Sequence, residues 1–349
     1  MNLIASTIGA AERAPLPDSL TLAGIEWLVS RAKRQLSDRS VQESDRFLTE
    51  MAQFPIAQHT DAANAQHYEL PQAFFGLVLG AQRKYSCCLY PDETTTLDEA
   101  EVFALAQTCE HAGLADGMDI LELGCGWGSL SLHMARAYPN ARIVSVSNSH
   151  SQRAYIEGVA ARRHLSNLTV ITADMNDFAT MQKFDRIVSV EMFEHMSNWR
   201  LLLERVRNWL DLDGRLFIHV FTNRSRSYRF LHDDPADWIG KYFFTGGIMP
   251  AADLAHQFPD LFTVEQAWRW SGTHYRRTAM DWLDNFDDNI ARIDPILQSV
   301  YGRDAGLWRR RWRLFFLATA GLFGHDGGRE WPIGHYLMKP AAISSGASS

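Results

Sequence analysis

The stretch LELGCGWGS, residues 121–129, decides the fold. It begins as a strand and turns into a helix through Gly124, Gly126 and Gly128. Glycines let a backbone approach a ligand closely, and the helix that follows presents its N-terminus to that ligand. The loop therefore predicts a site for a nucleotide-like ligand. A tight strand-to-helix turn that binds nothing is the plainer alternative.

Short apolar runs alternate with helical stretches around this loop, between Met118 and Val220. The expected strands are MDILELG, ARIVSVS, LTVITAD, FDRIVSVE and RLFIHVF, and the expected helices between them are SLSLHMARAY, QRAYIEGVAARR and WRLLLERVRNWL. Apolar runs of this length, separated by helices, are typical of parallel strands that are buried on both faces. The pattern predicts a doubly wound, Rossmann-like α/β sheet.

Four regions follow from the same patterning. Apolar residues at helical spacing predict an N-terminal helical cap over 1–66, before an α/β core over 67–221. Residues 222–340 are rich in tryptophan, and we expect a helical region that covers the substrate and completes the core, with helices near 276–290 and 304–323. Residues 341–349 are small and polar, which predicts a disordered tail.

Composition excludes several classes of protein. A formal net charge of −7 argues against nucleic acid as a partner, because phosphate binding leaves a basic footprint. No basic leader opens the chain, and the longest apolar run near its end is about half of the ~20 residues that a membrane span needs. The cysteines form neither a disulfide ladder nor a metal pair, so we predict free thiols, no metal and a cytoplasmic protein: Cys87, Cys88, Cys109 and Cys125.

Departures from the dinucleotide-binding pattern favour S-adenosylmethionine. The third glycine of that pattern is replaced by Ser129, and the next strand ends without the acidic residue that holds a ribose. Asn148 and Gln152 stand there instead and can bond ribose hydroxyls without a charge. Asp174 and Met175 end the following strand and suit an adenine amino group and ring face, although Asp174 alone is equally well explained as a helix cap.

Further motifs carry a family resemblance. KYSCCLY, EMFEHM, KYFFTGG and WSGTHYRRT, together with the glycine loop, resemble the cyclopropane fatty-acyl phospholipid synthase superfamily of S-adenosylmethionine-dependent methyltransferases. Within it, HYELP, the doubled cysteine and FFTGGIMP are most similar to amine-methylating enzymes of the coclaurine N-methyltransferase type. The resemblance runs from about His67 to Met338.

The resemblance implies roles for individual residues. Glu191, Glu194 and His195 look like the catalytic group of the amine enzymes. Lipid synthases hold a bicarbonate in the same cavity, and the positions that resemble its ligands are Cys87, Glu194, His219 and Tyr275. The positions that resemble cofactor contacts are Tyr85, Ser86, Gly124, Gly126, Gly128, Asn148, Gln152, Asp174 and Met175.

Methyl transfer to an amine needs a free lone pair, whereas an alkyl amine with a pKa of about 10 is protonated at neutral pH. Glu194 and His195 follow a strand and so lie at the carboxyl edge of the sheet, where such folds bind ligands. We expect His195 to accept the proton, Glu194 to attract the cation, and Glu69 to fold back toward the amine. Aromatic residues are expected to wall the pocket: Tyr85, Phe193, Trp238, Phe243, Phe244, Trp270 and Tyr275.

The leading hypothesis is a methyltransferase for a small-molecule amine. The alternative is a cyclopropane-fatty-acyl-phospholipid synthase, or fatty-acyl methyltransferase, that uses bicarbonate as its base and touches membrane lipid through the basic run RRRWR at 309–313. A module that binds S-adenosylmethionine without catalysis would leave the cluster Phe193–His195 unexplained. The sequence leaves open the identity of the acceptor and whether the protein is a monomer or a homodimer.

Overall fold

The computed structural model describes residues 12, 16–37, 42–58, 70–231 and 237–342. Its centre is a seven-stranded sheet with the order β3-β2-β1-β4-β5-β9-β8. The first five strands are parallel, and β9 runs antiparallel to both of its neighbours. The strands are β1 Asp119–Leu123, β2 Arg142–Ser147, β3 Leu168–Thr172, β4 Phe184–Val190, β5 Leu210–Phe221, β8 Phe262–Trp270 and β9 Ile333–Pro340.

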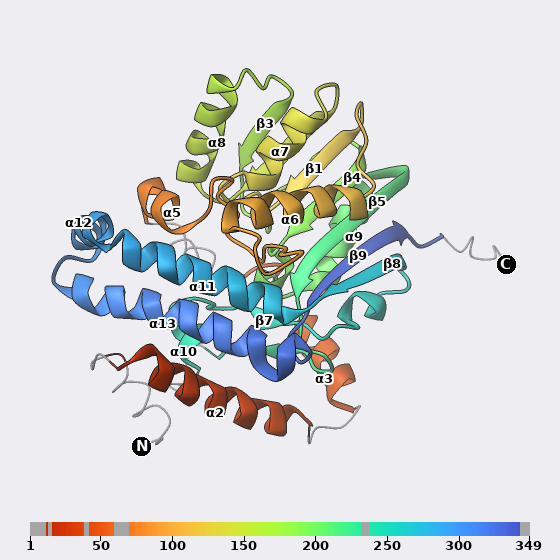
Figure 1. Ribbon diagram of the computed structural model, residues 1–349. Helices are drawn as coiled ribbons and strands as arrows, with labels where there is room; N and C mark the ends of the chain where they lie inside the picture. The colour runs from red at the N-terminus through yellow and green to blue at the C-terminus, as the bar shows by residue number, and fades with distance from the viewer. Residues whose placement is uncertain (1–11, 13–15, 38–41, 59–69, 232–236, 343–349) are drawn as a thin grey trace.

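Helices cover both faces of this sheet (Figure 1). On one face, α6 (Leu97–His111) and α7 (Ser129–Ala137) share an apolar cluster with β1 and β2. On the other face, α9 (Trp199–Trp209) and α3 (Gln42–Met51) pack against β4 and β5. Residues such as Ile120 and Leu121 face opposite sides because side chains alternate along a strand, so both sides must be covered. The predicted doubly wound sheet is confirmed.

Side-chain caps begin the helices where the sequence changes from loop to helix. Ser149 accepts the N–H of Gln152 at the start of α8 (His150–Arg162), and Asn198 does the same for Leu201 at the start of α9. Thr96 begins α6 with a complete capping box. These bonds satisfy donors that a helix cannot satisfy itself.

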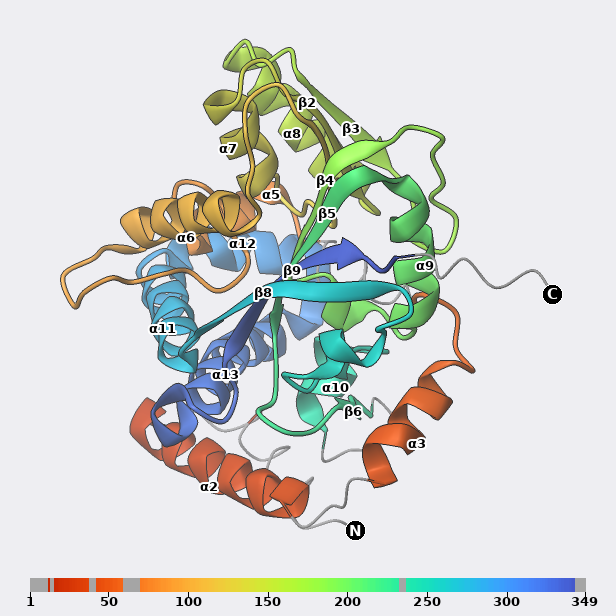
Figure 2. The same ribbon diagram turned by 90° about the vertical axis from the view of Figure 1, so that its right-hand side faces the viewer.

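A helical layer lies below the sheet as drawn in Figure 1. It contains α11 (Gly272–Asp288), α12 (Ile290–Tyr301) and α13 (Ala305–Gly324), and α2 (Asp18–Ser37) packs on α13 (Figure 2). At one crossing Ile25 sits against Gly321, where a Cβ atom would come within 2.4 Å of it. The shorter elements are α5 Gln72–Val78, α10 Trp238–Tyr242, β6 Tyr228–Arg229 and β7 Ile248–Met249.

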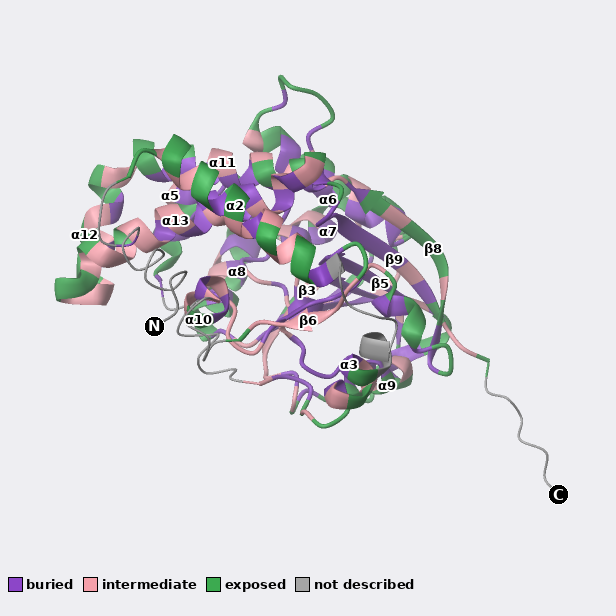
Figure 3. Ribbon diagram, turned by 90° about the horizontal axis from the view of Figure 1, so that it is seen from below, coloured by how far each residue is buried: buried purple, intermediate pink, exposed green. Residues whose placement is uncertain are grey.

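The region after residue 222 differs in one respect from the expected helical cover. It contains α11 and α13 near the predicted positions, and it also supplies β8 and β9, which the sequence patterns did not locate. β8 is an edge strand whose middle is exposed, so its residues lack the continuous apolar run of the central strands (Figure 3). Within the described ranges, none of the helices is long and apolar enough to cross a membrane. Residues 343–349 of the predicted tail lie outside the described residues.

Candidate active site

A cavity opens where the carboxyl ends of β1, β2, β3 and β4 meet. Parallel strands place the residues that follow them at one edge of the sheet, so segments far apart in sequence converge there. The cavity is lined by Ala57, Gln58, Gly124, Gly126, Val146, Ser147, Asn148, Gln152, Ala173, Asp174, Met175, Glu191, Met192, His195, Met196 and Thr245.

Each glycine of the loop after β1 has its own geometric reason. All three have positive φ angles, +78° at Gly124, +51° at Gly126 and +77° at Gly128. A Cβ atom at Gly124 would lie 2.5 Å from Met192, and one at Gly128 would lie 2.5 Å from Ile156. At Gly126 it would meet nothing within 4 Å, because this glycine faces the cavity. Gly126 therefore leaves room for a ligand, whereas the other two allow close packing.

Hydrogen-bonding groups suited to a nucleoside line the next two strand ends. Ser147 donates to Oε1 of Gln152 at 2.6 Å, and the buried Nε2 of Gln152 has no hydrogen-bond partner among the described residues. Asp174 accepts the N–H of Asn176 through Oδ1 at 2.7 Å and also lines the cavity. Buried polar groups in proteins are normally hydrogen-bonded, so a buried amide without a partner in the protein indicates that a bound ligand supplies the partner. The residues present therefore fit the ribose and adenine of S-adenosylmethionine.

Tyr85 and Ser86, two predicted cofactor contacts, do not line this cavity. Ser86 accepts a hydrogen bond from the buried Nζ of Lys84 at 2.5 Å. The ring of Tyr85 packs near Phe75 and Trp282, with ring centroids 5.3 and 5.5 Å away. Both residues directly precede Cys87 in the chain.

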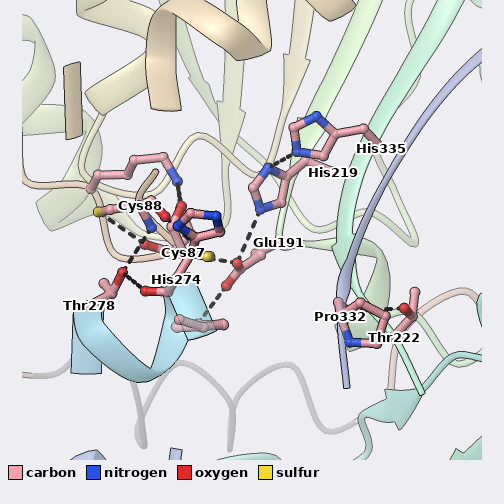
Figure 4. A network of polar contacts seen from close by, with 12 residues as sticks. Cys87, Cys88, Glu191, His219, Thr222, His274, Thr278, Pro332 and His335 are labelled. Atoms are coloured by element: carbon pink, nitrogen blue, oxygen red, sulfur yellow. Dashed lines mark hydrogen bonds and ion pairs between the residues drawn. The ribbon is translucent and has the colours of Figure 1, made fainter. Parts of the chain in front are cut away.

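Glu191, the first residue after β4, is the centre of a buried polar network (Figure 4). Its Oε1 accepts the backbone N–H of Cys87 at 2.9 Å and lies 3.3 Å from Nε2 of His219. Its Oε2 accepts the hydroxyl of Tyr275 at 2.7 Å. Glu191 has a φ of +47°, a conformation that side-chain-bearing residues rarely adopt and that often marks functional sites.

Three of the four positions that resemble bicarbonate ligands therefore contact a carboxylate of the protein itself. Cys87, His219 and Tyr275 surround Glu191. The fourth position, Glu194, lies in the short turn Phe193–His195 and is fully buried. Neither oxygen of Glu194 has a hydrogen-bond partner within the described part of the chain. The family resemblance grouped Glu194 with the other three positions, whereas the carboxylate that contacts these three in the structure is that of Glu191.

Burial acts on both carboxylates, but their surroundings differ. Burial raises the pKa of Glu191, while the charge of Lys84 and the bonds from Cys87 and Tyr275 lower it. Burial raises the pKa of Glu194 well above its usual value, and the charge of Glu191 raises it further. Two close carboxylates cannot easily both be ionised. Among the described residues only Glu191 has donors from other segments, so the proton of the pair is favoured on Glu194 and the negative charge on Glu191.

The comparisons with known proteins agree on a family. A family model described as mycolic acid cyclopropane synthetase matches residues 57–326. The chain belongs to the mycolic acid cyclopropane synthetase family. An (S)-coclaurine N-methyltransferase from Thalictrum flavum subsp. glaucum is 37% identical over 83% of this chain and 81% of that enzyme. A cyclopropane-fatty-acyl-phospholipid synthase from Escherichia coli (strain K12) is 31% identical over 77% of this chain and 66% of that one.

Solved structures confirm the fold. A coclaurine N-methyltransferase bound to N-methylheliamine and SAH matches with a TM-score of 0.92 and 33% identity, covering 97% of this chain and 100% of that one. A cyclopropane synthase from Mycobacterium tuberculosis, at 23% identity, matches with a TM-score of 0.67 over 81% of this chain and 98% of that one. This member of the mycolic acid cyclopropane synthetase family is an S-adenosylmethionine-dependent methyltransferase, as its sequence predicted.

His195 lines the cavity of this family member and stacks on Phe244, with ring centroids 4.6 Å apart and an angle of 15° between the planes. Gly247 permits this placement, since a Cβ atom there would lie 2.8 Å from the Phe244 ring. Burial lowers the pKa of His195 to about 4. The ring is therefore neutral at physiological pH and can accept a proton.

The aromatic residues that were expected to wall the pocket do not line the cavity among the described residues. Tyr275 reaches the network through its hydroxyl, and Trp270 packs against the ring of His219. Trp238 and Phe243 belong instead to the buried core, where Phe243 stacks on Phe315 at 4.4 Å. Glu69 lies outside the described residues. Among those that are described, no group of three or more His, Cys, Asp or Glu side chains could hold a metal ion.

The sequence analysis missed several lining residues, among them Gln58, Met192, Met196 and Thr245. Gln58 comes from the segment before the α/β core, and its side chain accepts a hydrogen bond from Ser197 at 3.1 Å. Met192 and Met196 flank the predicted turn, so their position beside Glu191 and His195 was the one available signal. Nothing in the local pattern around Gln58 points to a ligand.

Proposed function

We propose that this protein transfers the methyl group of S-adenosylmethionine to the nitrogen of a small amine of the alkaloid type. One observation carries the proposal. The carboxylate of Glu191 contacts Cys87, His219 and Tyr275, the three residues whose donors were expected to hold bicarbonate. A lipid synthase of this family needs that bicarbonate as its base. A site whose anion is part of the chain has no need of a free one.

A secondary ammonium ion loses one proton, its nitrogen bonds the methyl carbon, and the carbon–sulfur bond breaks to leave S-adenosylhomocysteine and a tertiary ammonium ion. When bound, the cofactor supplies an electrophilic methyl group on a sulfonium. The negative charge of Glu191 attracts the substrate cation, and the neutral ring of His195 accepts its proton. Glu194 offers the ammonium a buried oxygen without another hydrogen-bond partner among the described residues.

The cofactor side of the proposal rests on the loop from Gly124 to Gly128 and on the polar groups at the ends of β2 and β3. Gly126 leaves space for the cofactor, while Asn148 and Gln152 would bond its ribose. Asp174 and Met175 would bracket the adenine, through its amino group and its ring face. Tyr85 and Ser86 would act indirectly, by supporting the segment of Cys87.

The lipid alternative draws little support from the basic run 309–313. Arg309 pairs with Asp294, Arg311 pairs with Glu12, and Arg313 pairs with both Asp18 and Asp287. A cationic patch that binds anionic lipid needs charges that are not already neutralised. The run is part of α13 and joins this helix to the N-terminal region, to α11 and to α12.

In the decisive experiment, the purified protein is incubated with isotopically labelled S-adenosylmethionine and a panel of primary and secondary amines. A separate set of reactions contains unsaturated phospholipid vesicles in place of the amines. Both sets are run in carbonate-free buffer and again with added bicarbonate. We expect amine methylation that is equally fast in both buffers. Strict bicarbonate dependence together with cyclopropane or methyl-branched acyl products would overturn the amine assignment and leave the fold and cofactor standing.

The state of the cysteine thiols supports the proposal that the protein is cytoplasmic. All four cysteines are free and buried in the structure, which suits the cytoplasm. Mass mapping of the native protein should find every one of them reduced, and a disulfide between any two would contradict this compartment.

We keep the division into 1–66, 67–221, 222–340 and 341–349 as a proposal that limited proteolysis can test. Light scattering will decide between a monomer and a homodimer.

A further inference from the structure

Three histidines form a continuous line from Glu191 toward the surface. His219 on β5 and His335 on β9 are directly opposite in the antiparallel register, and Nδ1 of His219 lies 2.8 Å from Nε2 of His335. Nδ1 of His335 lies 2.8 Å from Nδ1 of His111, at the end of α6. Figure 4 shows the inner part of this line, from Glu191 through His219 to His335.

The two ends of this line differ in exposure. His219 and His335 have no exposed surface, whereas His111 is 9% exposed and lies flat on Trp268, with ring centroids 3.9 Å apart. Residues of three separate elements are thus aligned without a gap. A buried polar chain is expensive to build unless every member is satisfied.

Counting hydrogens restricts how the chain can be filled. A neutral imidazole carries one N–H and one acceptor nitrogen, and the line has three histidines and three links. Every link is satisfied only if all three N–H groups point toward Glu191 or all three point away from it. Any mixed arrangement sets two hydrogens, or two lone pairs, against each other across a 2.8 Å contact.

The charge on the glutamate selects between the two arrangements. An ionised Glu191 accepts a hydrogen bond from His219, so all three N–H groups point inward. If Glu191 is protonated, its own hydrogen faces Nε2 of His219 and the whole line reverses. The reversal takes up one proton at Nε2 of His111, passes one proton across each link and leaves one on Glu191, so atoms and charge balance.

The surroundings keep all three rings neutral, as both arrangements require, so the charge of Glu191 alone selects between them. Burial lowers the pKa of both His219 and His335 well below the usual value, and nearby positive charge lowers it further. Burial also lowers the pKa of His111. All three rings are therefore neutral at physiological pH. Glu191 additionally faces Lys84, Cys87, Tyr275, Glu194 and His195, and Glu110 acts on His111.

We propose that His335 and His111 are positioning residues for methyl transfer, which hold His219 in the tautomer whose Nε2–H faces Glu191 and so keep that carboxylate ionised. The proposal rests on the proposed amine methylation for its kinetic consequence. Its structural part, the tautomer of His219, does not depend on any substrate.

The first test therefore uses the protein without substrate. Histidine labelled with nitrogen-15 would be observed by NMR in the wild type and in His335→Leu, with the His219 signal assigned through a His219→Gln sample. We expect the wild type to show His219 protonated at Nε2 alone, and His335→Leu to show both tautomers. Protonation at Nδ1 in the wild type would overturn the proposal even if amine methylation stands.

The second test follows kcat against pH with one amine at saturation. We expect the acid limb of His335→Leu to move up by about one pH unit, which is a loss of about tenfold at the acid end. His335→Gln should recover most of that loss, because its amide can donate to Nδ1 of His219. His111→Phe keeps the stacking on Trp268 but loses the N–H, and should show a smaller shift in the same direction.

His325→Gln is the matched control, since His325 is a nearly buried histidine that contacts Glu26 outside the line. Its pH profile should equal that of the wild type, and calorimetry should find the same affinity for S-adenosylhomocysteine in every variant. An unshifted limb in folded His335→Leu, or a Gln variant no better than Leu, would overturn the positioning role. A wild type that methylates no amine would instead refute the proposed function, and the NMR result would still decide the tautomer.

Discussion

The two sides of the cavity are built in different ways. The proposed cofactor side consists of short local segments, each of which follows one strand of the parallel sheet: Gly124 to Gly128, Asn148 to Gln152, and Asp174 with Met175. The proposed acceptor side depends on Glu191, which lines the cavity and contacts the distant residues Cys87, His219 and Tyr275. A local motif can therefore specify the first side, whereas only the folded chain specifies the second.

The comparison also teaches why two glutamates three residues apart behave differently. Glu191 and Glu194 are both buried, yet one has three hydrogen-bonding neighbours and the other has none among the described residues. Burial raises the pKa of each, so the difference in charge comes from the donors that other segments bring. Residue type and spacing do not contain this information.

The largest effect is expected on the cofactor side. Gly126→Val places a branched side chain in the open space of the cavity at a φ of +51°, so the affinity for S-adenosylhomocysteine should fall by at least about 100-fold. Isothermal titration calorimetry measures this. Gly117→Ala is the control, because Gly117 has a φ of +86° and open space but lies outside the cavity lining. Unchanged affinity in Gly126→Val would remove the loop from the site.

The next effect is expected at the proton acceptor. His195→Ala should lower kcat by about 10²–10⁴-fold, the usual range for general-base steps, and the loss should shrink at high pH, where free amine is abundant. S-adenosylhomocysteine should still bind. His256→Ala, which removes an exposed histidine, is the control. A loss that stays constant from pH 6 to 10 would show that His195 does not act as a base.

The pH profile of the wild type sharpens this assignment. Because burial lowers the pKa of His195 to about 4, its basic form already predominates above that pH and is lost only below it. A rise in kcat/KM between pH 6 and 8 therefore belongs to the amine as it loses its proton. Amines of different pKa should shift the rise in parallel, and a rise that ignores the amine would assign it to the protein.

A smaller effect, with a more specific signature, is expected at Glu191. Glu191→Gly removes the carboxylate, suits the φ of +47°, and leaves the donors of Cys87, Tyr275 and His219 around an empty space. We expect a fall in kcat of about 10–100-fold, smaller than the ~10²–10⁴-fold of a general base because Glu191 holds the cation and does not take its proton, and partial recovery with added bicarbonate. Glu191→Gln, which fills the space, should not recover. Equal behaviour of the two variants would refute the anion role of Glu191.

The smallest effect is expected far from both sides. Arg309 and Asp294 form an exposed pair with N–O separation of 3.2 Å, so Arg309→Ala should change the free energy of unfolding by less than about 1 kcal/mol. Chemical denaturation measures the change, and methylation of the amine should be unaffected. A large drop in activity with lipid vesicles, but not with amines, would revive a membrane role for the basic run.

The sequence by itself determined the local features of this protein. The glycine loop, the strands between Met118 and Val220 and the polar residues that follow them depend on backbone conformation and on the period of apolar residues, both of which are written in neighbouring positions. Family motifs added Glu191, Glu194 and His195 as a group. These are the parts of the fold and site that the structure places where they were expected.

The tertiary structure decided the partners. β8 was not recognised because an exposed edge strand lacks a continuous apolar run. β9 lies inside the sheet between β5 and β8, where it brings His335 opposite His219. Tyr85 and Phe243 lie outside the cavity lining, although their motifs suggested a pocket. Which donors surround Glu191, and hence which carboxylate is charged, depends on contacts between residues that are 28, 84 and 104 positions apart in the chain. Such contacts form only when the chain folds, because burial and hydrogen bonding act through space and not along the sequence.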